Sequence, residues 1–250
     1  MSAIRDRPTK GFVADTISFS NVDGPGNRFV VFLQGCNFDC IVCHNPQTIP
    51  GHQRLEGFDP DHRSVDELLG EIRQAAPFIR GITASGGEAT QQPAFLKALF
   101  SAVKADPDLA HLTCFVDSNG ATERHVWDDI APVTDAAMID LKCLDPDIHR
   151  EMTGQPNHEV LASIEHLEQL GLLYEVRLLI LAGVNDHPEL LRRTARWLAD
   201  VDPSMRIKLI GFRAHGARPH DPPLVEPRHE ALLAAADLLR QVADFDICIV

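Results

Sequence analysis

The chain has 250 residues, of which 44% are hydrophobic, and this is enough to build a substantial core within one α/β domain. Its formal net charge is −13, so we do not expect a basic surface that binds nucleic acid. The N-terminal stretch MSAIRDRPTKGF lacks the apolar region of a secretory signal, and no apolar run reaches ~18 residues. We therefore expect a cytoplasmic protein with no membrane partner.

From residue 28 onward, short apolar strands alternate with amphipathic helices. The predicted strands cover residues 28–35, 81–87, 112–120, 135–143, 173–183 and 205–212. The predicted helices cover residues 64–76, 93–105, 123–132, 158–171, 188–201 and 227–243. Ser64 and Glu67 form a capping box at the start of the first helix, and the tail FDICIV predicts a short edge strand.

These six strand–helix pairs predict a parallel sheet with right-handed helical crossovers, in a single domain that spans residues 1–250. The sheet could close partly into a barrel or stay open and doubly wound. In either case, the functional residues are expected at the C-terminal ends of the strands.

Three cysteines, Cys36, Cys40 and Cys43, follow the first predicted strand directly with the spacing C-x3-C-x2-C. Thiolate sulfur binds zinc and iron–sulfur clusters. A structural zinc site needs a fourth ligand, which His44 or His52 could supply. A [4Fe–4S] cluster normally takes four cysteines, so three of them leave one iron open to a substrate or cofactor.

The other cysteines lie apart from this group. Cys114, Cys143 and Cys248 occur in apolar, strand-like runs, so we expect each to be a small buried residue. With six cysteines in a chain of cytosolic character, a metal or redox role is favoured over a disulfide framework. The loop 46–63 is long and polar and contains no cysteine.

Polar motifs follow the second and third predicted strands. In SGGEA, Gly86 and Gly87 would let the backbone approach a ligand closely, and Glu88 offers a carboxylate. In DSNG, Asp117 and Ser118 offer further oxygen atoms. Both motifs are also compatible with ordinary turns.

The fourth predicted strand contains MIDLK, in which Met138, Asp140 and Lys142 share one face because they are two residues apart. A strand that helices cover on both sides should be apolar throughout, so these charges indicate a wet, functional interior. The alternative is a structural ion pair. Glu175 and Arg177 repeat the pattern on the fifth strand.

Five segments together resemble a known family, the radical S-adenosylmethionine (SAM) enzymes, and within it the glycyl-radical-enzyme activases. They are, in order, DGPGNRFVVFLQGCNFDCIVCHNP, TASGGEA, DSNG, MIDLK and EVRLLILAGVND, and the resemblance covers residues ~15–215. It implies a partial (β/α)6 TIM-like barrel of the radical SAM type. It also implies one [4Fe–4S] cluster on the three cysteines, with SAM chelating the open iron. An electron from the cluster would then cleave SAM to a 5′-deoxyadenosyl radical.

The same resemblance implies roles for further residues. The segment with Gly86, Gly87 and Glu88 would bind the methionine part of SAM, with Glu88 near the ammonium group. Asp117 would lie near SAM, and Arg177 would face SAM or the substrate. The remaining expected SAM-site residues are Ser118, Asp140 and Lys142. A monovalent cation could bind among Asp117, Ser118, Met138 and Asp140, and Asp23 of DGPG would lie on the substrate side.

The activity implied by the resemblance is the removal of a hydrogen atom from a glycine Cα of a partner glycyl radical enzyme. A flavodoxin- or ferredoxin-type protein would donate the electron. One alternative is a radical SAM enzyme that acts on a small molecule or peptide. The other is a non-catalytic zinc or iron–sulfur binding module. The chain departs from the family pattern at Val42, where an aromatic residue is common, and at Phe212-Arg213, where an aromatic–histidine pair often occurs.

Overall fold

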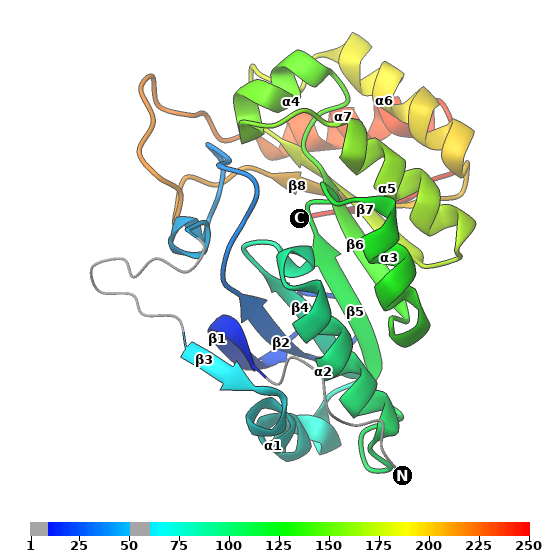
Figure 1. Ribbon diagram of the computed structural model, residues 1–250. Coiled ribbons are helices and arrows are strands. Elements are labelled where there is room, and N and C mark those ends of the chain that lie inside the picture. Colours follow the sequence, from blue (N-terminus) through cyan, green and yellow to red (C-terminus); the bar gives the residue numbers. More distant parts are fainter. Residues whose placement is uncertain (1–9, 51–60) are drawn as a thin grey trace. The chain divides into compact units, whose positions relative to one another are not determined.

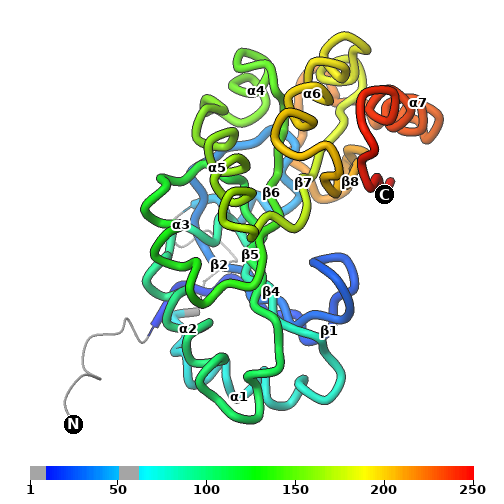
Figure 2. The backbone as a smooth tube through the Cα atoms, turned by 90° about the vertical axis from the view of Figure 1, so that its right-hand side faces the viewer, coloured from blue at the N-terminus to red at the C-terminus, as the bar shows by residue number. Residues whose placement is uncertain are grey.

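The computed structural model describes residues 10–50 and 61–250 and shows an α/β protein (Figures 1 and 2). The strands are β1 (Lys10–Ser20), β2 (Arg28–Leu33), β3 (Asp61–Ser64), β4 (Gly81–Gly86), β5 (Thr113–Ser118), β6 (Ala136–Leu141), β7 (Leu173–Ile180), β8 (Arg206–Gly211) and β9 (Asp246–Ile249). The α-helices are α1 (Val65–Ala75), α2 (Pro93–Ala105), α3 (Arg124–Ile130), α4 (Pro146–Thr153), α5 (His158–Gln169), α6 (Pro188–Val201) and α7 (His229–Arg240). Four short 3-10 helices are η1 (Pro46–Thr48), η2 (Ala76–Phe78), η3 (Ala89–Gln91) and η4 (Ala131–Val133).

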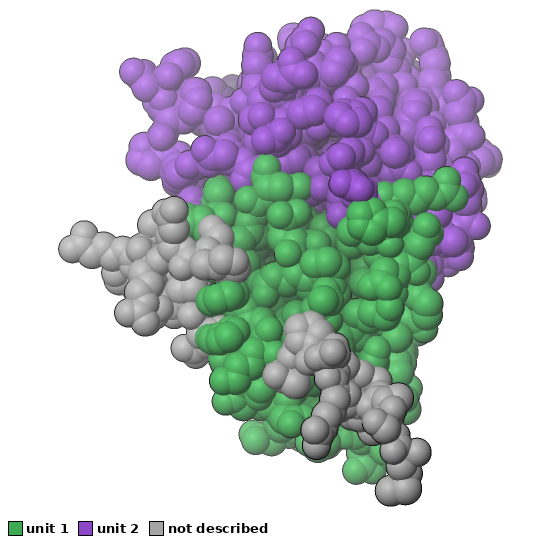
Figure 3. Space-filling model, viewed as in Figure 1, with its two compact units in different colours: residues 1–37, 47–118, 124–137 green, residues 38–46, 119–123, 138–250 purple. Residues whose placement is uncertain are grey.

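The chain forms two compact units, coloured separately in Figure 3. Unit 1 comprises residues 1–37, 47–118 and 124–137, and unit 2 comprises residues 38–46, 119–123 and 138–250. Each unit is therefore assembled from segments that are distant in the sequence. The prediction of a single domain over residues 1–250 stays a prediction.

Unit 1 contains a sheet with the order β3-β1-β2-β4-β5. β1 pairs with β2 and β3 in antiparallel fashion, whereas β2, β4 and β5 are parallel. Helices α1 and α2 lie side by side, as do α2 and α3 (Figure 1). The C-terminal ends of β2, β4 and β5 therefore come together at one edge of the sheet, as expected for parallel strands.

Unit 2 contains the parallel strands β7, β8 and β9, with β9 at the edge. Helices α6 and α7 pack against each other, and α5 packs against β7. Strand β6 carries the chain from unit 1 into unit 2, because its first two residues belong to the former and the rest to the latter.

The six predicted strand–helix pairs and the C-terminal edge strand are confirmed, and the pairing is mostly parallel. The Ser64–Glu67 capping box is present, with the Ser64 side chain accepting from the Glu67 amide at 3.2 Å. Two strands and one α-helix were not predicted, namely β1, β3 and α4, and neither were the short 3-10 helices. The loop expected over residues 46–63 thus contains η1 and most of β3. Residues 1–9, 51–60 and the alternative zinc ligand His52 lie outside the described residues.

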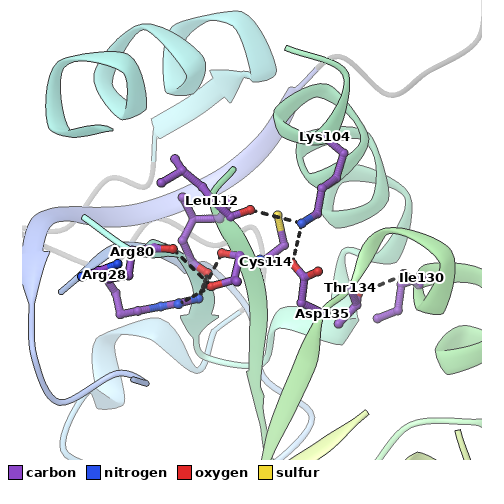
Figure 4. A network of polar contacts seen from close by, with 10 residues as sticks. Arg28, Arg80, Lys104, Leu112, Cys114, Ile130, Thr134 and Asp135 are labelled. Atoms are coloured by element: carbon purple, nitrogen blue, oxygen red, sulfur yellow. Dashed lines mark hydrogen bonds and ion pairs between the residues drawn. The ribbon is translucent and has the colours of Figure 1, made fainter. Parts of the chain in front are cut away.

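The N-terminal ends of the unit 1 strands are fixed by a polar network (Figure 4). The guanidinium of Arg28, which is fully buried, donates to the Thr113 hydroxyl at 2.7 Å and stacks over Phe115. On the neighbouring turn, Asp135 accepts from the Cys114 amide at 2.6 Å and from Lys104 at 2.5 Å. Cys114 is thus a buried structural residue, as predicted. Cys143 is also buried, whereas Cys248 is exposed, so that part of the prediction is wrong.

Among the described residues, no helix is both long enough and apolar enough to cross a membrane.

Candidate functional site

The loop after β2 carries Cys36 and is held in unit 1 by backbone hydrogen bonds. The Gly35 amide donates to the Thr48 carbonyl at 2.8 Å, and the Cys36 amide donates to the Ile49 carbonyl at 3.0 Å. The side-chain amide of the buried residue Gln34 donates to the Gln47 carbonyl at 3.1 Å. These bonds fix the backbone that positions the first thiol.

The two glycines of SGGEA lie where β4 meets the same loop. A Cβ at Gly86 would stand 2.2 Å from the backbone nitrogen and oxygen of Leu33, and Gly86 has a left-handed φ of +120°. A Cβ at Gly87 would stand 2.3 Å from the Gly35 oxygen and 2.6 Å from the Thr48 oxygen. Both positions require glycine because the backbone of a neighbouring segment passes so closely, a cause that the sequence alone did not reveal.

Glu88 lies at the end of β4 with a side chain that is 1% exposed. Its Oε1 accepts from the Ser118 hydroxyl at 2.8 Å and from the Thr90 amide at 2.9 Å. Nearby on β5, Asp117 Oδ2 accepts from the Ser85 hydroxyl at 3.0 Å. Unit 1 therefore brings together five predicted site residues, namely Gly86, Gly87, Glu88, Asp117 and Ser118.

Asp23, the predicted substrate-side residue, lies in the turn between β1 and β2. Its carbonyl accepts from the Thr83 hydroxyl at 2.7 Å, and its carboxylate accepts from the Ser20 hydroxyl. These contacts show how the DGPG turn is anchored to β4, and the role of Asp23 toward a substrate stays a prediction.

Cys40 and Cys43 belong to unit 2, where α4 supports their segment. The Asp39 amide donates to the Thr153 carbonyl at 3.0 Å, and the Ile41 amide donates to the Met152 carbonyl at 2.9 Å. Both carbonyls belong to the last turn of α4, whose carbonyl groups have no partner within the helix. The unpredicted helix α4 thus positions the second and third thiols.

The C-terminal part of unit 2 also contacts this segment. Arg218 donates to the Cys40 carbonyl at 3.0 Å and forms an ion pair with Asp39. The His44 ring stacks on Phe212 with centroids 6.1 Å apart, and its Nε2 lies 2.7 Å from the Arg213 carbonyl oxygen. This stack joins residues that are distant in the sequence, so no local motif predicted it.

Both positive and negative side chains act on the two thiols of unit 2. Burial raises the pKa of the Cys40 thiol to about 11, and the ammonium of Lys142 opposes this rise. Burial likewise raises the pKa of the Cys43 thiol. A hydrogen bond with the Asn45 backbone and the charges of Lys142 and Arg218 lower this pKa and partly offset the rise. After burial, Asp39 also raises the pKa of each thiol, and Asp140 raises that of Cys40. The two cations favour the thiolate form that binds iron.

The predicted charged residues of β6 and β7 also belong to unit 2. Lys142 donates to Asp140 at 2.7 Å, and Arg177 Nε donates to Glu175 at 2.9 Å. Arg177 Nη2 also lies 3.0 Å from the Met138 sulfur. The ion pairs expected if these residues were purely structural are therefore present. The roles of these residues in SAM or cation binding stay predictions. Lys208 on β8, which was not predicted, lies 3.8 Å from Glu175.

The residues present fit a thiolate-bound iron–sulfur cluster by their chemistry. They offer three cysteine sulfurs, two with cations nearby, on segments fixed by backbone hydrogen bonds. Cys36 belongs to unit 1, and Cys40 and Cys43 belong to unit 2. In the described part of the chain, no group of three His, Cys, Asp or Glu side chains is arranged to hold a metal ion. The shared cluster stays a prediction.

Comparison with known proteins defines the class. Residues 30–195 match the family model described as "Radical SAM superfamily". The chain therefore belongs to the radical SAM superfamily. Members of this superfamily use a [4Fe–4S] cluster and SAM, and these are the cofactors of this enzyme.

Two curated relatives define the group within the superfamily. The pyruvate formate-lyase-activating enzyme of Streptococcus mutans is 33% identical over 215 residues, or 82% of this chain and 79% of the relative. The pyruvate formate-lyase 1-activating enzyme of Escherichia coli K12 is 33% identical over 205 residues, or 80% of this chain and 79% of the relative. The chain thus belongs to the glycyl-radical-enzyme activating enzymes of the radical SAM superfamily.

Solved structures support the fold. The crystal structure of SuiB from Streptococcus suis bound to S-adenosylmethionine superposes with a TM-score of 0.66. The match covers 87% of this chain and 48% of the SuiB chain. Its sequence identity is 12%, so the similarity concerns the fold alone. The partial (β/α)6 barrel predicted from the sequence is consistent with this match.

Proposed function

We propose that this enzyme creates a glycyl radical on a partner protein by removing a hydrogen atom from one glycine Cα. The observation that carries the proposal is the 33% identity to pyruvate formate-lyase-activating enzymes over four fifths of the chain. The cysteine triplet directly after β2 supports it independently, since the C-terminal ends of parallel strands are the usual place for catalytic loops.

In this proposal, Cys36, Cys40 and Cys43 hold the [4Fe–4S] cluster. SAM is bound by residues within or directly after β4 to β7: Gly86, Gly87, Glu88, Asp117, Ser118, Asp140, Lys142 and Arg177. When bound, the cluster and SAM supply the one-electron chemistry that removes the hydrogen atom.

The chain's own residues would orient the SAM molecule through charge. The buried carboxylate of Glu88, already oriented by Ser118, is suited to accept from the ammonium group of SAM. The cations Lys142 and Arg177 are suited to attract its carboxylate, although each also contacts an acidic residue. We also propose a flavodoxin- or ferredoxin-type electron donor and a cytoplasmic location, because free thiols persist in reducing compartments.

The test uses anaerobically reconstituted enzyme with SAM, a reductant and a co-encoded candidate partner with deuterium on its glycine Cα. We expect a glycyl radical signal in electron paramagnetic resonance and deuterium in the 5′-deoxyadenosine formed. Deuterium transfer from a small molecule, with none from any candidate protein, would instead establish the small-molecule alternative.

A further inference from the structure

The segment that follows β8 has a defined shape although it contains no helix or strand. Residues 212–224, here called the C-terminal strap, lie entirely in unit 2. The Ala217 amide donates to the Ala214 carbonyl at 3.1 Å, and the Ala214 amide donates to Glu226 at 2.8 Å. Pro219, Pro222 and Pro223 restrict the backbone further. The strap is thus largely preorganised.

The strap lines a partly open cavity of about 320 Å³, which is within the usual range for binding pockets. The lining is mainly apolar, with two polar side chains, Arg218 and His220, among Phe212, Ala214, Ala217, Pro219, Pro223 and Leu224. An aliphatic or aromatic side chain fits these walls better than a polar metabolite does, because the lining offers few groups that could replace water.

The cavity adjoins the segment that carries Cys40 and Cys43. Phe212 and Arg218 both line the cavity, and both contact that segment, through His44 and through the Cys40 carbonyl. A molecule held in the cavity would therefore lie beside the proposed cluster ligands of unit 2.

The charge of the strap differs from that of the chain as a whole. The strap carries Arg213 and Arg218 and the acidic residue Asp221, in a chain of net charge −13, and Arg218 is already paired with Asp39. Arg213 is exposed, and it lies between two residues that line the cavity. Arg213 is thus the strap cation that remains for a partner, and its exposed guanidinium favours an acidic side chain there.

We propose that this cavity is a specificity pocket for the partner protein and receives one aliphatic or aromatic side chain from the segment around its reactive glycine. An acidic side chain of the same segment pairs with Arg213. This inference rests on the proposed function, and it deepens that function by stating what the partner must present to the enzyme.

The first experiment fills the cavity. Ala217→Phe places a ring in it, and Ala234→Phe makes the same change on the exposed surface of α7. We expect the KM for the partner to rise on the order of tenfold or more in Ala217→Phe alone, because a buried apolar side chain loses its site. Circular dichroism reports whether each variant is folded, and iron content reports whether it holds its cluster. If Ala217→Phe fails to fold, Ala214→Phe replaces it as the cavity-filling variant.

A KM in the cavity-filling variant equal to that of wild type and of Ala234→Phe would overturn the pocket. If indole, a small apolar compound, changes the rate of SAM cleavage by the wild-type enzyme and the partner protein does not displace it, the cavity binds a metabolite and the proposal is wrong. Failure of the proposed function is distinguishable, because wild type would then transfer no deuterium from any protein partner.

The second experiment tests the charge. Arg213→Gln should raise the KM for the partner severalfold at low salt and weaken its dependence on salt concentration. Arg196→Gln, a matched change on the exposed side of α6, should leave both unchanged. An identical salt dependence in Arg213→Gln and wild type would refute the acidic contact.

Discussion

Substitution of Gly87 by alanine tests whether the close approach of β4 to the cysteine loop matters. The added Cβ would lie 2.3 Å from the Gly35 oxygen, about 1 Å short of the 3.4 Å at which ordinary van der Waals contact begins. Since the nearest atoms belong to backbone, the loop must move, and Gly35 directly precedes Cys36. Overpacking of this kind costs about 1–3 kcal/mol of folding free energy.

The functional effect should exceed the effect on stability. A displacement of about 1 Å can reduce the rate of an enzymatic reaction ~100-fold, because reacting groups lose their alignment. We expect reconstituted Gly87→Ala to hold less iron, to bind SAM more weakly and to form 5′-deoxyadenosine roughly 100-fold more slowly. Iron analysis, anaerobic calorimetry with SAM and urea unfolding measure these quantities.

Gly70→Ala is the matched control. Gly70 lies in α1, has no left-handed φ, and an added Cβ would meet nothing within 4 Å. It should leave iron content and SAM affinity unchanged and stabilise α1 by up to ~1 kcal/mol, the difference in helix propensity. If Gly87→Ala retained wild-type iron content, SAM affinity and activity, the steric reasoning would be refuted.

Three further predictions concern the cysteines. Alanine at Cys36, Cys40 or Cys43 should abolish cluster binding and SAM cleavage, whereas alanine at Cys114, Cys143 or Cys248 should preserve the cluster spectrum; an equal loss in both groups would contradict the assignment. In native protein at pH 8, iodoacetamide should modify the exposed Cys248 but neither Cys114 nor Cys143, because burial raises their thiol pKa to about 12 and about 11. The folded pKa of Cys114 lies above the ordinary 9.0, so its contribution to stability is complete below pH 9 and is lost as pH rises toward 12. The free energy of unfolding measured in urea should therefore fall less over this pH range in Cys114→Ala than in wild type. Labelling of native Cys114 at the rate of Cys248 would argue against its burial.

The parts of the fold with strong periodicity were predictable from the sequence. Helix α6 was predicted with its observed bounds because Pro188 marks its start and leucines recur on one face. Strand β3 was missed because it lies at the edge of the sheet and its sequence, DHRS, is polar. Strand β1, beside it, is largely exposed in its second half, so its sequence lacks a continuous apolar pattern. Helix α4 has only eight residues, and its ends depend on Asp145 and Gly154 rather than on an apolar stripe.

The candidate site was predictable only where neighbouring residues act together. Glu88 and Ser118 were identified through their motifs, and the structure joins them by a hydrogen bond. The Arg218–Asp39 ion pair connects residues 179 positions apart, and no local pattern points to it. The close approach at Gly87 likewise depends on the path of Thr48 in another segment.

The contacts around Cys40 also set an order of events during synthesis on the ribosome. The segment 38–46 emerges early, but the α4 carbonyls that hold its backbone follow more than a hundred residues later, and Arg218 later still. At ordinary elongation rates, Asp39 waits roughly ten to forty seconds for its ion-pair partner. The native contacts around Cys40 and Cys43 are therefore complete only after residue 218 has been synthesised.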